Sequence, residues 1–80
     1  MVSMKTRLYQ IRKELQPKVS QEKLAFAAGV SRQWYHRLET GKQERISYTT
    51  ARNILNALNA ERQARNLSAL TLDQLNLRIV

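Results

Sequence analysis

The chain has 80 residues, a length that fits one small domain. Its 14 Lys and Arg against 6 Asp and Glu give a formal charge of +8, which indicates either an anionic partner, nucleic acid or an anionic membrane surface, or a charge that serves only solubility. It has no cysteine and a single histidine, His36, which excludes disulfides and thiolate zinc sites and argues against a histidine-rich metal or catalytic centre. The sequence has neither a signal-peptide pattern nor an apolar run of membrane-spanning length, so we expect a soluble, cytoplasmic chain.

The predicted elements are short helices separated by breaks at Pro17, Gly29 and Gly41. The first helix is predicted over residues 3–15, with Ser3 as its N-cap and apolar residues at spacings of four, three and four. Pro17 is expected to end it, because a helix usually stops at or before the residue that precedes a proline.

The next three helices are each predicted to begin after a serine N-cap. Ser20 precedes a helix over 21–28, and Ser31 precedes one over 32–39. Ser47 precedes a helix whose buried side starts at Tyr48 and which could extend through residues 60–65. Together these segments predict an all-α fold, a compact bundle of four or five helices.

The last residues differ in character from the rest. Residues 66–80 carry Asp73 and Arg78 and no net charge, and they are rich in Leu. Residues 71–74 have capping-box spacing over one short turn, and 77–80 favour a strand. We divide the chain into a domain over 1–66 and an apolar tail over 67–80, which packs on that domain or on a partner subunit. Phe26 is predicted to be exposed, and we expect the tail to cross its surface or to be exchanged with a second subunit.

Residues 21–38, QEKLAFAAGVSRQWYHRL, carry the most informative pattern: two short helices around a Gly-Val-Ser turn. Ala25 is small enough for the helices to approach closely, and Gly29 suits the turn. At about 100° per residue, one face of the second helix packs through Tyr35 and Leu38 and the opposite face is polar. This arrangement is typical of a helix-turn-helix, whose second helix can enter a DNA major groove.

The run over residues 20–42, S-Q-E-K-L-A-x-x-A-G-V-S-R-Q-x-x-x-x-L-E-x-G-K, resembles the Cro and λ-repressor type of helix-turn-helix, the XRE family. The resemblance extends over roughly residues 5–60. It implies a bundle of four or five helices that binds operator DNA, usually as a homodimer. The chain departs from the family in the segment between the first two helices, which is about two residues longer than is common.

The resemblance also implies roles for individual residues. Arg32, Gln33 and Arg37 match positions that read base edges, and arginine and glutamine have the chemistry to recognise guanine and adenine. His36 shares their face, and we include it among the base-reading candidates.

A second set of candidates would contact the DNA backbone. Gln21, Ser31 and Lys42 match family positions near phosphates, and Lys18 lies in the lengthened loop close to the expected backbone. Trp34 either packs at the edge of the core or contacts a thymine methyl group or a sugar of the DNA.

Arg12 and Glu39 match a pair that in many family members forms an ion pair between the first helix and the end of the recognition helix. We therefore assign them a structural role, because breaking a buried ion pair is costly.

These features predict a sequence-specific regulator of transcription, a repressor that binds double-stranded DNA as a homodimer and reads the major groove with residues 32–39. We expect no enzymatic activity, catalytic residue, metal, cofactor, small-molecule ligand or membrane contact, since the acidic residues form no metal spacing and no glycine-rich phosphate loop is present. The alternative is an antitoxin or anti-repressor whose apolar tail, 67–80, binds a protein partner.

Overall fold

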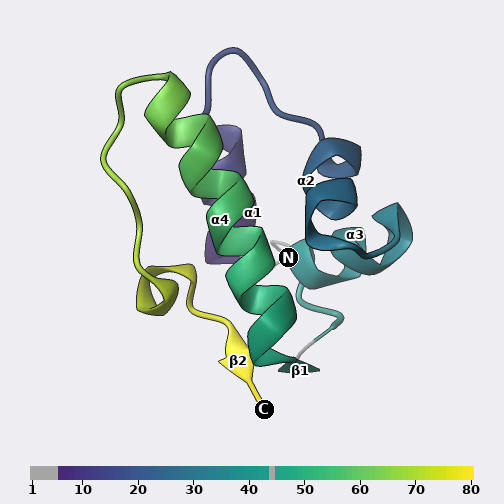
Figure 1. Ribbon diagram of the computed structural model, residues 1–80. Coiled ribbons are helices and arrows are strands. Elements are labelled where there is room, and N and C mark those ends of the chain that lie inside the picture. Colours follow the sequence, from purple (N-terminus) through teal and green to yellow (C-terminus); the bar gives the residue numbers. More distant parts are fainter. Residues whose placement is uncertain (1–5, 44) are drawn as a thin grey trace, which may run out of the picture.

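Four α-helices carry the fold in the computed structural model, which describes residues 6–43 and 45–80 (Figure 1). The expectation of an all-α helical bundle is confirmed. The α-helices are joined by a 3₁₀ turn and two very short strands. In chain order the elements are α1 (Arg7–Lys13), α2 (Gln21–Ala28), α3 (Arg32–Glu39), β1 (Arg45–Ile46), α4 (Tyr48–Ala64), η1 (Leu72–Leu75) and β2 (Arg78–Ile79).

Serine caps set the starts of three helices, as predicted. The hydroxyls of Ser20, Ser31 and Ser47 each accept a hydrogen bond from the backbone N–H three residues on, which satisfies a donor that the first helical turn leaves unpaired. The predicted extension of the last helix is also confirmed, because α4 continues to Ala64.

The first helix is shorter than predicted. It begins at Arg7 and ends at Lys13, and its N-cap is Thr6, whose hydroxyl accepts from the Tyr9 N–H at 3.3 Å. The Thr6 N–H donates to the backbone oxygen of Glu39 at 3.1 Å, which ties the start of α1 to the end of α3. Ser3, the predicted cap, lies outside the described residues.

Glycines with positive φ end the two helices of the motif. Gly29 has φ 75° and Gly41 has φ 82°, a left-handed conformation that costs free energy for a residue with a Cβ. After α3, the Lys42 N–H donates to the Arg37 oxygen and the Gly41 N–H donates to the Leu38 oxygen. This is the Schellman pattern, and it satisfies carbonyls at the end of α3 while turning the chain sharply away.

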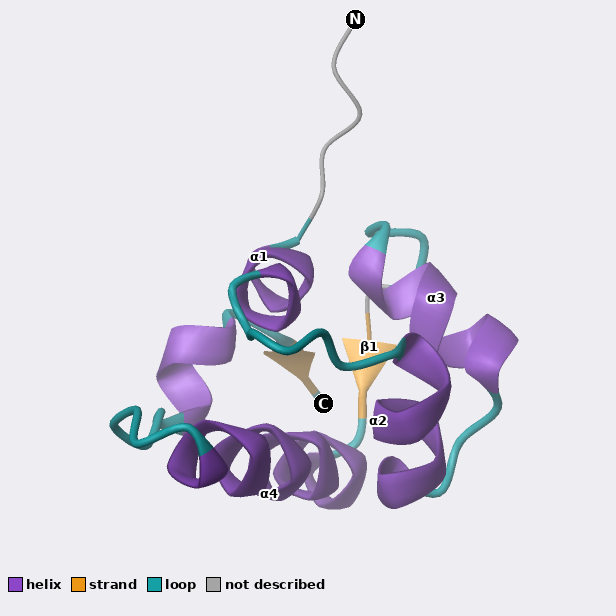
Figure 2. Cartoon of the chain, turned by 90° about the horizontal axis from the view of Figure 1, so that it is seen from above, coloured by secondary structure: helices purple, strands orange, loops and turns teal. Residues whose placement is uncertain are grey.

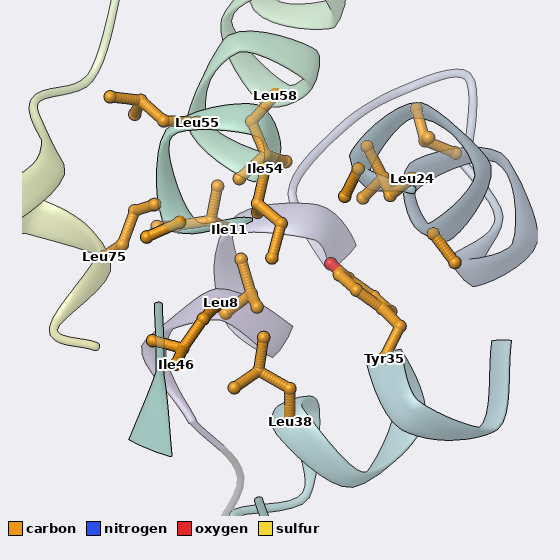
Figure 3. Packing of buried hydrophobic residues seen from close by; sticks show 14 of the residues in the cluster. Leu8, Ile11, Leu24, Tyr35, Leu38, Ile46, Ile54, Leu55, Leu58 and Leu75 are labelled. Atoms are coloured by element: carbon orange, nitrogen blue, oxygen red, sulfur yellow. The ribbon is translucent and has the colours of Figure 1, made fainter. Parts of the chain in front are cut away.

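The core lies between α4 and the three preceding helices (Figure 3). Tyr35 extends from α3 into this core and is fully buried. Burial is the larger cause and the negative charge of Glu39 the next of a raised pKa of the Tyr35 phenol. The placement of Tyr48 on the buried side of α4 was wrong, because its side chain is 56% exposed. As the first residue of α4, it lies one turn before Ala51, where the buried stripe of the helix begins.

The tail packs along α4 and α1 and returns to β1 (Figure 2). Leu75 of η1 is completely buried, and β2 runs parallel to β1, with Ile46 opposite Ile79. The predicted terminal strand is therefore present. The expectation that this tail crosses the surface at Phe26 was wrong, because Phe26 is 86% exposed. Exchange of the tail with a second subunit stays a prediction. The tail instead follows the other side of the bundle, where the partly buried leucines of η1 and its flanks meet the core.

Candidate nucleic-acid interface

The two helices of the motif divide their residues between the core and solvent. α2 buries Leu24, Ala25 and Ala28. α3 buries Tyr35, Leu38 and Glu39, while its opposite face leaves four polar side chains exposed. The exposed residues of that face are Arg32, Gln33, His36 and Arg37. One side of α3 is therefore packed in the core, and the opposite side is exposed to solvent.

An open depression of about 410 Å³, which we call the α3 groove, lies beside this exposed face. It is lined by the four residues predicted to read bases and by one residue predicted to contact the backbone: Gln21, Arg32, Gln33, His36 and Arg37. Two arginines give the groove a positive charge, and its amide and guanidinium groups supply several hydrogen-bond donors. The chemistry suits an anionic ligand with acceptor groups on a flat edge.

An ion pair beneath the groove joins α1 to α3. Arg12 Nε donates to Glu39 Oε2 at 2.6 Å, and Arg12 Nη2 donates to Glu39 Oε1 at 3.0 Å. The Glu39 side chain is fully buried and that of Arg12 is 14% exposed. The hydrogen bond from Arg12 to Glu39 raises the pKa of the guanidinium further above its ordinary value. Such a bidentate pair fixes the orientation of both side chains.

Gln21 connects this ion pair to the α3 groove. Its Nε2 donates to Glu39 Oε1 at 2.9 Å and lies 3.3 Å from His36 Nδ1. Gln21 is the first residue of α2 and directly follows the N-cap Ser20, so the position of its side chain also depends on that cap. A single side chain thus contacts both the buried Glu39 carboxylate and His36 on the exposed face of α3.

The other residues predicted to contact the DNA backbone are not among those that line the α3 groove, and they lie in different local settings. Ser31 caps α3, with its oxygen accepting from the Trp34 N–H at 3.0 Å, and its hydroxyl hydrogen can still donate to a phosphate. Lys42 is exposed directly after α3, where its N–H donates to the Arg37 oxygen at 2.9 Å. Lys18 is exposed in the loop before α2. Trp34 is partly buried and packs against the core.

Sequence reasoning missed a second polar cluster, which joins α2 to α4. The Glu61 carboxylate pairs with Lys23 Nζ at 2.8 Å and with Arg65 Nη1 at 2.8 Å. The hydrogen bonds from Lys23, first, and from Arg65 lower the pKa of Glu61. The helical spacing of Glu61 and Arg65, four residues apart, is the one local signal that could have indicated part of this cluster.

A family model described as a helix-turn-helix domain matches residues 6–70. The chain belongs to the helix-turn-helix family. The match covers all four α-helices and stops before η1. This helix-turn-helix protein is therefore built around a DNA-binding domain, with α3 in the place of the helix that enters the major groove. No curated protein and no solved structure matches it.

The described residues of this helix-turn-helix protein contain neither a metal-binding cluster nor a membrane-spanning helix. Within residues 6–43 and 45–80, no three His, Asp or Glu side chains lie together as a metal ion would require. Of the helices in that same part of the chain, none combines the length and the apolar composition of a membrane span.

Proposed function

We propose that this helix-turn-helix protein is a sequence-specific regulator of the Cro and λ-repressor type, which represses transcription by occupying promoter DNA. It acts as a homodimer in the cytoplasm, on nucleoid DNA, and by binding rather than by catalysis. α3 enters the major groove, and its exposed face reads the base edges.

The observation that carries this proposal is the α3 groove. Arg32, Gln33 and Arg37 project from the same exposed face of one helix, and the chemistry of each suits a base edge. An arginine binds guanine at O6 and N7, and a glutamine binds adenine at N6 and N7, each such pair contributing about 1–3 kcal/mol of discrimination. His36, held beside Gln21, adds a fourth polar contact.

Backbone contacts would set the register of α3 on the duplex. In this proposal the backbone N–H of Gln21 and the hydroxyl of Ser31 contact phosphates from the starts of α2 and α3, and Lys42 does so from just beyond the end of α3. Lys18 and the exposed edge of Trp34 complete the backbone set. These contacts carry no sequence information but provide the salt-dependent part of the affinity.

Two copies related by a two-fold axis would place two α3 helices about 34–36 Å apart, one turn of the duplex. The operator of a homodimer is therefore expected to be an inverted repeat whose half-sites are about one turn apart.

Selection of bound sequences from random duplex DNA tests the proposal directly. We expect enrichment of one inverted repeat, with binding that weakens steeply as salt increases. Enrichment of a single unrepeated site would overturn the homodimer, and recovery of no sequence preference would overturn sequence-specific recognition.

A further inference from the structure

We propose that Arg65, at the end of α4, is a positioning residue that holds the loop before α2 so that Lys18 meets the DNA backbone in a fixed place. This inference rests on the proposed function, since it concerns how the loop contacts DNA. The loop comprises residues 14–20, which connect α1 to α2 past the C-terminal end of α4 (Figure 1). We call residues 16–19 the clamped segment.

The guanidinium of Arg65 binds the clamped segment through two consecutive carbonyls. Its Nε donates to the Gln16 oxygen at 3.0 Å, and its Nη2 donates to the Pro17 oxygen at 2.6 Å. These contacts join residues 48 and 49 positions apart in the chain. Because the guanidinium is planar and rigid, two such bonds fix the direction of the backbone as well as its distance.

A second arginine holds the other end of the clamped segment. Arg12, already paired with Glu39, donates from Nη1 to the Val19 oxygen at 3.0 Å. The side chains of Leu15 and Val19 are buried on either side of the exposed stretch. Lys18 therefore lies between the bonded carbonyls of Pro17 and Val19, with its own side chain exposed.

Arg65 is placed to position the loop rather than to contact DNA itself. Its side chain is only 15% exposed, and Nη1 donates both to the Glu61 carboxylate and to the Glu61 backbone oxygen at 2.8 Å. Its positive charge is thus compensated within the protein. The other Glu61 oxygen pairs with Lys23 of α2. The cluster that holds Arg65 therefore also connects the end of α4 to α2.

This arrangement lowers the entropic cost of a DNA contact made from the exposed loop between α1 and α2. An unrestrained loop would lose conformational freedom on binding DNA, which lowers affinity. With three carbonyls bonded beforehand, Lys18 is held in advance of the encounter. The loop then acts as a rigid extension of α2, whose first residue is Gln21.

A double-mutant cycle on the full chain tests the positioning role, using the duplex enriched by selection and a scrambled duplex. Lys18→Ala should reduce the slope of log affinity against log salt by about 0.9, the value for one phosphate contact. In an Arg65→Ala background, the same substitution should change the slope by close to zero. Additive effects of the two substitutions would overturn the proposal, because a purely structural Arg65 would leave the Lys18 contact unchanged.

Arg62→Ala is the matched control. Arg62 lies on the same helix, carries the same charge, and donates from Nε to the Ser68 oxygen on the tail side at 2.7 Å. Its removal lowers the net charge equally but leaves the clamped segment untouched, so the effect of Lys18→Ala should be that of the unmodified protein. Loss of the Lys18 effect in this background as well would contradict the assignment to Arg65.

Backbone 15N relaxation without DNA separates the clamp from the function. Arg65→Ala should lower the order parameters at Lys18 and Val19 while those of α4 stay unchanged, and Arg62→Ala should lower none of them. Unchanged order parameters at Lys18 and Val19 would overturn the clamp. If Arg65→Ala does not fold, Arg65→Lys, which keeps the charge but cannot bridge two carbonyls in a planar fork, is measured in the same way. Absence of salt-dependent DNA binding by the unmodified protein would overturn the proposed function and the role of Lys18, while the relaxation result would still report on the clamp.

Discussion

The side-chain amide of Gln21 donates to Glu39 Oε1 at 2.9 Å, so the first residue of α2 is bonded to the last residue of α3. The angle between the two helices is therefore secured at their ends as well as through the packed residues of the turn. Since Glu39 also receives two hydrogen bonds from Arg12, the carboxylate joins three helices at one buried point.

Removing this carboxylate should strongly destabilise the fold. We expect Glu39→Ala to lower the free energy of unfolding by about 3–5 kcal/mol, because it leaves the largely buried Arg12 without its partner. Urea unfolding measures this loss. Glu14→Ala is the control, since it removes the same charge from an exposed position at the end of α1. Equal stability of the two variants would contradict the structural role of Glu39.

Arg37 and Lys42 should differ in how their loss affects DNA binding. Arg37→Ala is expected to cost about 1–3 kcal/mol on the selected site and to relax preference at one base position. Lys42→Ala should weaken binding to all sequences alike and lower the salt slope by about 1. Titrations of selected and scrambled duplexes distinguish the two. Equal losses on both duplexes for Arg37→Ala would remove it from the base-reading set.

The Glu61 cluster should make stability depend on acidic pH. Lys23 and Arg65 lower the pKa of Glu61 in the folded state. The Glu61 carboxylate therefore stabilises the fold fully at pH values above its ordinary pKa of 4.5. This contribution is lost as the pH falls through the lowered pKa of the folded state. Unfolding of the unmodified protein and of Glu61→Gln should therefore differ at pH 7 and converge in acid. A difference that stays constant down to the acid transition would show that the carboxylate charge is not involved.

Leu75 should anchor the tail to the helices. Its side chain is completely buried, so Leu75→Ala is expected to cost about 2–5 kcal/mol. Leu67→Ala removes the same atoms from a side chain that is 41% exposed and should change stability by no more than about 0.5 kcal/mol. Thermal or urea unfolding compares them. A tolerated Leu75→Ala would mean that the tail is dispensable for the fold.

Elements specified by local chemistry could be predicted from the sequence. Ser20, Ser31 and Ser47 each cap a helix by reaching a backbone N–H three residues away, and Gly29 and Gly41 end helices through a conformation that other residues avoid. These signals act within a few positions of the chain, so the pattern of residues contains them. The exposed face of α3 follows from the same helical period.

Features that depend on distant residues could not be predicted in this way. β1 is two residues long and exists through its pairing with β2, 33 positions later, and the contacts of Arg65 reach back 48 and 49 positions. Tyr48 has an apolar character suited to the core, but its place at the start of α4 leaves it exposed. The bond from Gln21 to Glu39 likewise joins residues that no local spacing relates.

The division of α3 into a buried side and an exposed side has a consequence for how such a protein changes its target. The residues that hold α3 in place, Tyr35, Leu38 and Glu39, are different from those that face the solvent. Arg32, Gln33 and Arg37 can therefore be exchanged for other polar residues while the scaffold keeps its shape. Under the proposed function, new operators would be accessible through a few surface substitutions, and His36, held beside Gln21, is the position of that face where a change would also reach the framework.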